Sequence, residues 1–276
     1  MKVHPNIKFL RRDALPHGLC PGCGCGQILN YFLYAIDELK LDIDKMALVT
    51  GVGCSSRIPV YIDAYVIHGV HGRTFPIATG IKLANPEVNV VIFTGDGDCA
   101  AIGGNHFIQA ARRNLDVTTI LVNNRIYGMT GGQVAPTTPS DAITSTTPLG
   151  NVECPFDLCK LAEAAGATYV SRWTTAHPRS CINAIKKGIQ HKGFSFIEIV
   201  SQCPTYFGRY ALGFREPEQF INWLRENSVP KEKANKMSPE ELRTKIVVGE
   251  FVEKRKPTLI EQYMEMEKRV RRHVNA

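Results

Sequence analysis

The sequence contains no run of about 18 apolar residues, the length that an α-helix needs to cross a bilayer. Its first residues, MKVHPNIKFLRRD, lack the apolar stretch of a secretory signal. The net charge of +7 is moderate, and acidic residues interrupt nearly every basic segment, which argues against a basic surface for nucleic acid. Internal repeats and low-complexity tracts are also absent. These absences predict a cytoplasmic protein that binds neither membrane nor nucleic acid.

The chain has nine cysteines, an odd number that does not suit a framework of disulfides in a reducing compartment. Three of them, Cys20, Cys23 and Cys25, lie within the short segment HGLCPGCGCGQ. A Cys-x-x-Cys pair with Pro and Gly between its thiols suits an iron-sulfur cluster, a zinc ion or a thioredoxin-like redox couple. We therefore expect this segment to bind a metal or to carry redox chemistry.

Segments with helical spacing of apolar residues alternate with short segments rich in β-branched residues. This alternation predicts an α/β fold whose parallel sheet is covered by helices on both faces. The expected helices cover residues 27–40, 75–85, 103–114, 155–166 and 177–190, and the expected strands cover residues 45–53, 88–98, 116–124, 168–173 and 194–204.

Two segments depart from this alternation. Residues 125–154 lose all periodicity and are rich in Gly, Thr and Pro, so we expect an active-site loop there. Beyond Pro204 we expect no further strands. The predicted organisation is an α/β domain over residues 1–204, which carries the site, followed by C-terminal helices and an extended arm over residues 205–276, which make subunit contacts.

Polar residues follow two of the predicted strands directly. Asp96 lies in the segment FTGDGDCAAIGG, and Asn124 follows 28 positions later in VNNRIYGMTGGQ. Both are expected at the carboxyl edge of neighbouring strands, where their side chains can reach one ion. Oxygen ligands of this kind, with a backbone carbonyl, suit Mg²⁺ bound to a diphosphate. Taken alone, the GDGD segment could equally be a tight turn.

The GDG segment and the NN pair at this spacing resemble the signature of the thiamine diphosphate enzymes. The chain resembles more specifically the β subunit of the 2-oxoacid:ferredoxin oxidoreductases, over about residues 19–204. The segments that carry this resemblance are CPGCG, GVGCSSRIP, HGVHGR, GDGD, NHFIQAARRN and NNRIYGMTGGQ. The resemblance implies the thiamine-diphosphate-binding fold.

The resemblance also implies the cofactor ligands. Asp96, Asn124 and the carbonyl of Ile126 would bind Mg²⁺. The thiamine diphosphate site would be lined by Gly53, Ser55, Gly95, Gly97, Asp98, Thr130 and Gly131. A 4Fe-4S cluster would be held by Cys20, Cys23, Cys54 and Cys203. The remaining cysteines, Cys25 among them, are expected to be buried structural thiols.

Three further residues are candidates for contact with the substrate. Arg57 in CSSRIP could bind a distal carboxylate in bidentate fashion, which favours 2-oxoglutarate over pyruvate; the alternative is a surface or interface cation. Met129 could lie against the methylene groups of the substrate or simply pack in the core. His71 could face the cofactor or the oxoacid, or only hydrogen-bond to the backbone.

The function implied by the resemblance is oxidative decarboxylation of a 2-oxoacid, with transfer of the acyl group to coenzyme A and of single electrons through the cluster to ferredoxin. An α subunit would supply the activating Glu, in an (αβ)₂ complex or with additional small ferredoxin-like subunits. The substrate best supported is 2-oxoglutarate, with pyruvate or a branched-chain 2-oxoacid as alternatives. A non-redox thiamine-dependent decarboxylase subunit and a non-enzymatic electron-transfer subunit are the competing interpretations.

Overall fold

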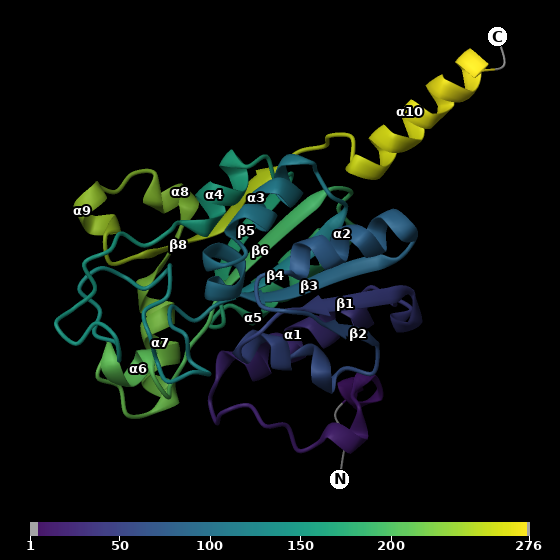
Figure 1. Cartoon of the computed structure of the whole chain (residues 1–276). Helices are drawn as coiled ribbons and strands as arrows, with labels where there is room; N and C mark the ends of the chain where they lie inside the picture. Colours follow the sequence, from purple (N-terminus) through teal and green to yellow (C-terminus); the bar gives the residue numbers. More distant parts are fainter. Residues whose placement is uncertain (1–4, 275–276) are drawn as a thin grey trace.

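The computed structural model describes residues 5–274 of the chain and contains an eight-stranded sheet. The strand order is β2-β1-β3-β4-β6-β5-β8-β7, and neighbouring strands are parallel except β5 and β8 (Figure 1). The strands are β1 (Met46–Thr50), β2 (Tyr65–His68), β3 (Asn89–Gly95), β4 (Val117–Asn123), β5 (Tyr169–Thr174), β6 (Phe194–Val200), β7 (Ser228–Pro230) and β8 (Ile246–Glu253).

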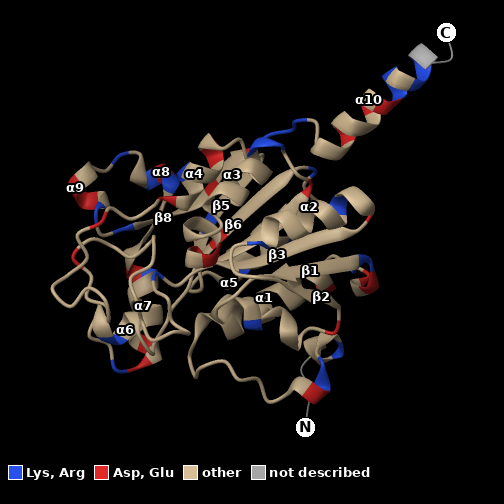
Figure 2. Ribbon diagram, in the orientation of Figure 1, with Lys and Arg blue, Asp and Glu red and all other residues tan. Residues whose placement is uncertain are grey.

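Helices cover both faces of the sheet, as the alternating pattern predicted. One apolar core lies between the sheet and helices α1 (Gly24–Glu38) and α5 (Pro178–Gln190). The other lies against α2 (Thr74–Ala84), α3 (Gly104–Arg112) and α4 (Leu158–Ala164). Strands β1, β4 and β6 are buried along their whole length, which explains why they read as continuous apolar runs. The charged residues lie mainly on the helices and connecting segments around the sheet (Figure 2).

The prediction that strands end at Pro204 is wrong. Strand β8 enters the sheet beside β5, antiparallel to it, and pairs with β7 on its other side. Burial alternates only in part along IVVGEFVE, and its two glutamates made this segment look like a solvated arm. The C-terminal helices are α6 (Phe207–Tyr210), α7 (Pro217–Asn227), α8 (Lys231–Ala234), α9 (Pro239–Leu242) and α10 (Leu259–Val274).

Short helical turns connect the main elements. The 3₁₀ turns are Pro5–Phe9, Arg12–Ala14, Ile43–Lys45, Cys54–Arg57 and Pro59–Tyr61, and a π-helical turn covers Gly97–Ala101. Single π turns of this kind are frequent at functional sites. Among the helices of residues 5–274, none combines the length and the apolar character that a bilayer span requires.

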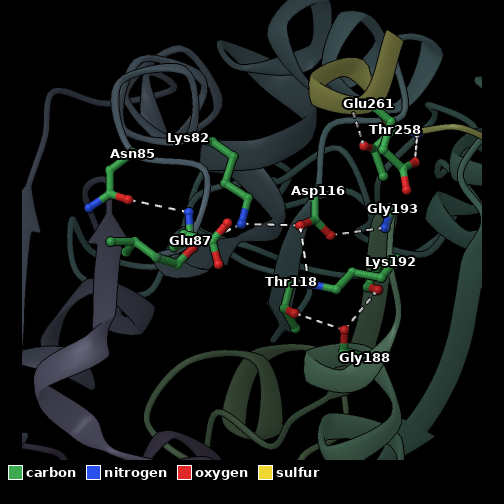
Figure 3. Close-up of polar contacts among 12 residues, drawn as sticks. Lys82, Asn85, Glu87, Asp116, Thr118, Gly188, Lys192, Gly193, Thr258 and Glu261 are labelled. Carbon is green, nitrogen blue, oxygen red and sulfur yellow. Dashed lines mark hydrogen bonds and ion pairs between the residues drawn. The ribbon is translucent and has the colours of Figure 1, made fainter. Parts of the chain in front are cut away.

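A buried ion pair closes the amino edge of the sheet. Lys82 Nζ lies 3.1 Å from Asp116 Oδ2 and donates a hydrogen bond to the carbonyl of Val88 at 2.9 Å. The Asp116 carboxylate also accepts a hydrogen bond from Gly193 N at 3.0 Å. Figure 3 shows these contacts between the end of α2 and the starts of β4 and β6. Because this edge is filled by its own side chains, the carboxyl edge is the one left open for a ligand.

Candidate functional site

The candidate site lies where β1, β3, β4 and β6 end side by side. Neighbouring parallel strands leave a crevice at their carboxyl ends, and ligands of open α/β sheets bind there. Asp96 directly follows β3 and Asn124 directly follows β4, and these two strands pair in register. Cys54 follows β1 by a short turn, and Cys203 follows β6. The fold therefore brings residues from four separate segments to one edge.

The carboxylate of Asp96 is buried, with the residue 3 % exposed. The hydroxyl of Thr137 lies 2.5 Å from Asp96 Oδ2 and 2.9 Å from Asn123 Oδ1. Burial raises the pKa of Asp96 to about 6, although the hydrogen bond from Thr137 acts in the opposite direction. A cation bound here would compensate the buried charge and keep the carboxylate ionised. Thr137 lies in the loop that follows β4, and no motif of the sequence pointed to it.

The two adjacent asparagines have different surroundings. Asn123 is buried, donates from Nδ2 to Glu198 Oε1 at 2.7 Å, and accepts from the backbone of Arg125 at 3.1 Å. Asn124 is only half-buried and lines the cavity beside Asp96. Its amide oxygen accepts a hydrogen bond from Ile126 N at 3.3 Å. Asn124 is therefore the one that can reach a ligand, while Asn123 holds the end of β4 in place.

A cavity of about 140 Å³ opens between these strand ends. All the residues predicted to bind thiamine diphosphate or Mg²⁺ line this cavity except Gly131. His71 and Met129 line it too, whereas Arg57 does not. Gly97 has to be glycine, because a Cβ there would lie 2.1 Å from the ring of Tyr127. The lining residues are Val52, Gly53, Cys54, Ser55, His71, Gly95, Asp96, Gly97, Asp98, Val122, Asn124, Ile126, Tyr127, Gly128, Met129 and Thr130.

Asp98 orders one wall of this cavity. Its Oδ1 atom accepts hydrogen bonds from Gly72 N at 2.8 Å and from Val52 N at 3.3 Å, and its Oδ2 atom accepts from the hydroxyl of Thr94 at 2.8 Å. The Nδ1 atom of His71 lies 2.6 Å from Oδ1. This contact orients the imidazole so that Nε2 is its remaining polar atom. Asp98 thus links the loop that follows β1 to the loop that follows β2. Both of its carboxylate oxygens are already hydrogen-bonded to protein groups.

Four cysteines line a second cavity, of about 500 Å³. They are the predicted quartet Cys20, Cys23, Cys54 and Cys203, and the cavity also includes Arg57 and Met129. Among residues 5–274, no three side chains of His, Cys, Asp or Glu stand close enough to hold a single metal ion. In this part of the chain the four thiols therefore line one cavity and are not drawn together around a single point.

Backbone contacts bring the N-terminal pair of cysteines to Cys203. Gly24 N donates to the carbonyl of Gln202 at 3.1 Å, and the Gln202 side chain donates to the carbonyl of Gly22 at 3.0 Å. Gly22 has a φ of 73°, and a Cβ there would lie 2.4 Å from Pro217 Cβ. Glycine is thus required for the turn between Cys20 and Cys23.

The thiols of the quartet differ in their surroundings. A hydrogen bond from the thiol of Cys25 lowers the pKa of Cys23 to about 7, and the same contact, with burial, raises the pKa of Cys25. Burial raises the pKa of Cys54 to about 12 and also raises the pKa of Cys203. Positive charge in this cavity would be needed to hold all four as thiolates. Cys25 is buried against the core and acts on Cys23.

The two cavities adjoin. Cys54, Asn124, Gly128 and Met129 line both of them. A Cβ on Gly128 would lie 3.5 Å from Cys54 Sγ, 3.6 Å from Cys203 Sγ and 3.7 Å from Asn124 Nδ2. Gly128, which has no side chain, therefore lies at the junction of the cysteine cavity and the cavity of Asp96, together with Cys54, Asn124 and Met129.

A buried polar network holds Asn123, the residue that precedes Asn124 at the end of β4, and it was not predicted from the sequence. Arg172 Nε donates to Glu198 Oε2 at 2.7 Å, and Arg172 NH2 lies 2.5 Å from Asp157 Oδ1. Glu198 in turn holds Asn123. A signal was present, because Glu198 is a charged residue inside the apolar run FSFIEIV and therefore requires a buried partner.

The chain is similar to known proteins in sequence. Residues 51–199 match the family model described as thiamine pyrophosphate enzyme, C-terminal TPP binding domain. A protein of Methanocaldococcus jannaschii named 2-oxoglutarate synthase subunit KorB is 56 % identical over 260 residues, which are 94 % of this chain and 96 % of that protein. A protein of Mycobacterium tuberculosis named 2-oxoglutarate oxidoreductase subunit KorB is 43 % identical over 187 residues, which are 68 % of this chain and 50 % of that one.

A similar structure has also been solved. It is the 2-oxoglutarate:ferredoxin oxidoreductase from Magnetococcus marinus, with 2-oxoglutarate, coenzyme A and succinyl-CoA bound. The TM-score is 0.84 at 33 % sequence identity, and the match covers 98 % of this chain and 92 % of the other. The fold is thus shared over nearly the whole length, including the C-terminal elements.

Proposed function

Because the chain belongs to the β subunits of the 2-oxoacid:ferredoxin oxidoreductases, we propose that it is the β subunit of a 2-oxoglutarate:ferredoxin oxidoreductase. The reaction converts 2-oxoglutarate and coenzyme A to succinyl-CoA and carbon dioxide, and the two electrons released reduce two ferredoxins. The observation that carries this proposal is the pair of adjoining cavities with Gly128 between them. A site that only decarboxylates needs the first cavity alone.

The cavity of Asp96 fits a diphosphate held through Mg²⁺. Asp96, Asn124 and the carbonyl of Ile126 would bind the cation, because carboxylate, amide and carbonyl oxygens are its preferred ligands. Gly97 and Thr130 lie on the walls where the diphosphate would sit, and Gly131 follows Thr130 in the chain but does not line the cavity. When bound, thiamine diphosphate supplies the nucleophilic carbon that releases carbon dioxide from a 2-oxoacid. The protein binds and orients it.

The cysteine cavity fits a 4Fe-4S cluster better than a zinc ion. Its four thiols come from three separate segments and line one cavity of about 500 Å³. Raised pKa values of Cys54 and Cys203 indicate that these thiolates need a strongly cationic group beside them. When bound, such a cluster supplies an acceptor for single electrons. The free thiols and the ferredoxin partner agree with a cytoplasmic location.

Arg57, Met129 and His71 are the proposed substrate contacts. Arg57 is exposed on the rim of the cysteine cavity, and Met129 lies between the two cavities. This arrangement supports a role for Arg57 in binding the distal carboxylate of 2-oxoglutarate, with Met129 along the methylene groups. His71 presents Nε2 because Asp98 engages Nδ1. The position of Arg57 outside the Asp96 cavity requires a substrate long enough to reach it.

An α subunit is the proposed partner at the mouth of the Asp96 cavity, where it would supply the activating Glu in an (αβ)₂ assembly. Large apolar side chains are exposed around this mouth and along the edge strand β2. Several large exposed apolar side chains of this kind are typical of a contact with another protein. The exposed residues are Val52 (42 %), Tyr65 (67 %), Ile67 (40 %), Val70 (73 %), Ile102 (53 %) and Met129 (47 %).

The test is a substrate panel on the co-purified αβ complex, prepared without oxygen and supplied with thiamine diphosphate, Mg²⁺ and coenzyme A. We expect ferredoxin or viologen reduction that depends on coenzyme A and is fastest with 2-oxoglutarate. Equal or faster turnover of pyruvate or a branched-chain 2-oxoacid would overturn the substrate assignment. Carbon dioxide release without any electron transfer would favour a non-redox decarboxylase subunit instead.

A further inference from the structure

The last described helix, α10, projects away from the α/β body (Figure 1). Its base is fixed, because Glu261 N donates to the hydroxyl of Thr258 at 3.1 Å and the Glu261 carboxylate accepts from Thr258 N at 2.7 Å. These two residues are seen at the base of the helix in Figure 3. Leu259 is 9 % exposed and donates from its backbone to the carbonyl of Asn114 at 3.2 Å. The direction of the helix is therefore set by the body.

One face of α10 carries an uncovered apolar stripe. Tyr263, Met266 and Val270 follow one another at spacings of three and four residues and are 48 %, 54 % and 55 % exposed. This spacing continues from Leu259 at the base and is that of the a and d positions of a coiled coil. Nothing within residues 5–274 of the same chain covers these three side chains. The stripe is thus suited to pack against another helix.

The charges of α10 are divided along its length (Figure 2). The half next to the body is acidic, and the outer half is basic. The acidic residues are Glu261, Glu265 and Glu267, and the basic residues are Lys268, Arg269, Arg271 and Arg272. Two pairs within the helix, Glu265 with Arg269 and Glu267 with Arg271, stabilise the single helix. These pairs are exposed, so the charges can still face a neighbouring helix, and within the described residues the apolar stripe has no partner.

We propose that α10 pairs with α10 of a second copy of this chain, in antiparallel orientation. Antiparallel pairing sets the acidic half of each helix against the basic half of the other, whereas parallel pairing would oppose like charges. In a two-fold symmetric contact, each of these interactions occurs twice. A helix of this length spans only about 24 Å, so the contact strengthens an assembly and is not expected to hold isolated helices together. The inference depends on the proposed function in one respect, because the pairing is placed in the proposed (αβ)₂ complex.

The test uses charge reversal in the intact co-expressed complex. In one variant Glu265 and Glu267 are replaced by Lys, which makes most of the helix basic and leaves the Glu261 contacts at its base intact. In the other, the four basic residues Lys268, Arg269, Arg271 and Arg272 are replaced by Glu, which makes it acidic throughout. The two β variants carry different affinity tags and are co-expressed with the α subunit. Native mass spectrometry then measures the share of complexes that contain both tags.

Two differently tagged wild-type β subunits are expected to mix statistically, so that about half of the complexes carry both tags. Each exposed ion pair contributes little to the free energy of pairing. Several together should favour the complex that contains both variants about tenfold over each complex that contains only one of them. The mixed share should then rise to about nine-tenths. When a variant with both halves reversed is mixed with the wild type, the mixed share should fall below one half, because antiparallel pairing then sets like charges against each other.

A matched control places the same charge change elsewhere. Glu226 and Glu232 are exposed on the C-terminal elements and are replaced by Lys. This control should leave the mixed share at one half. A statistical share for the two α10 variants, or complexes that contain only one β subunit, would overturn the proposal. Oxidation of 2-oxoglutarate is assayed on the same preparations, so failure of the proposed function is read separately from failure of the pairing.

Discussion

The hydroxyl of Thr137 lies 2.5 Å from the carboxylate of Asp96, although the two residues are 41 positions apart in the chain. Asp96 ends one strand, and Thr137 lies in the long loop after the next. This contact links the proposed Mg²⁺ ligand to Asn123 and, through it, to the buried Glu198. The cation site is therefore supported by a hydrogen-bonded network that reaches behind the sheet edge.

Removal of the Thr137 hydroxyl should weaken cofactor binding. In Thr137→Val, Asp96 loses a hydrogen bond to its charged form, which is worth about 1.5–3 kcal/mol, and Mg²⁺-dependent thiamine diphosphate binding should weaken roughly tenfold or more. Isothermal titration of the complex measures this. Thr119→Val is the control, because its buried hydroxyl has no hydrogen-bond partner within the described residues. Equal affinities of the two variants would contradict a role for Thr137.

The two adjacent asparagines should behave differently on substitution. Asn124→Ala is expected to abolish Mg²⁺-dependent binding with little change in thermal stability, because Asn124 faces the cavity. Asn123→Ala is expected to lower the free energy of unfolding by about 1–3 kcal/mol, because it leaves Glu198 with an unpaired buried oxygen. Thermal melting and titration on both variants separate the effects. Loss of binding in Asn123→Ala alone would reverse the assignment.

The affinity for Mg²⁺ and thiamine diphosphate should depend on pH through Asp96. Only the ionised carboxylate binds a cation, and burial raises the pKa of Asp96 to about 6. Affinity should therefore be constant well above pH 6 and should fall about tenfold per pH unit below it. Without the cation, the raised pKa means that the stability contributed by protonated Asp96 is lost as the pH rises through about 6. Titration between pH 5 and 8 tests this, and a flat profile would argue against Asp96 as a ligand.

Loss of one thiol of the quartet should remove the cluster and leave the first cavity intact. We expect Cys54→Ala, purified without oxygen, to lose its bound iron, its visible absorbance and viologen reduction. Thiamine diphosphate should still bind, because its proposed cation ligands follow β3 and β4. Cys154→Ala is the matched control, since this cysteine is exposed and lies outside the cavity. Unchanged iron content in Cys54→Ala would remove Cys54 from the quartet.

Cys25→Ala tests whether the thiol next to the quartet acts on Cys23 without being a ligand. This thiol lowers the pKa of Cys23 through a hydrogen bond. The variant should retain its iron at neutral pH, and the pKa of Cys23 in the protein without a cluster should rise toward its ordinary value. Alkylation rates between pH 6 and 9 report that pKa. Loss of iron would instead place Cys25 among the ligands.

Substitution of Arg57 should change the choice of substrate. Arg57→Ala is expected to lower kcat/KM for 2-oxoglutarate by about ten- to a hundredfold, since a bidentate charge-assisted contact contributes about 1.5–3 kcal/mol. Turnover of pyruvate, which has no distal carboxylate, should change little. Arg57→Lys should recover only part of the activity, because lysine cannot make the bidentate contact. An equal loss with both oxoacids would show that Arg57 does not select the substrate.

Several features were readable from the sequence because they depend on residues close together in the chain. The continuous apolar runs of β3, β4 and β6 and the helical spacing between them predicted the parallel sheet, and the sheet is confirmed. The GDGD and NN segments marked the ends of two strands that prove to be neighbours. Strand β8 was missed because a strand that carries two glutamates resembles an exposed segment unless its antiparallel partner, β5, is known.

What the sequence by itself determined is the type and order of most elements and the family to which the chain belongs, because local periodicity and motif spacing are written in neighbouring residues. The tertiary structure decided which distant side chains meet. It assigned Asn124 rather than Asn123 to the cavity, brought Thr137 onto Asp96, and placed both Cys54 and Cys203 close to Gly128. These relationships depend on how loops from different strand ends pack against one another, and no local pattern encodes that packing.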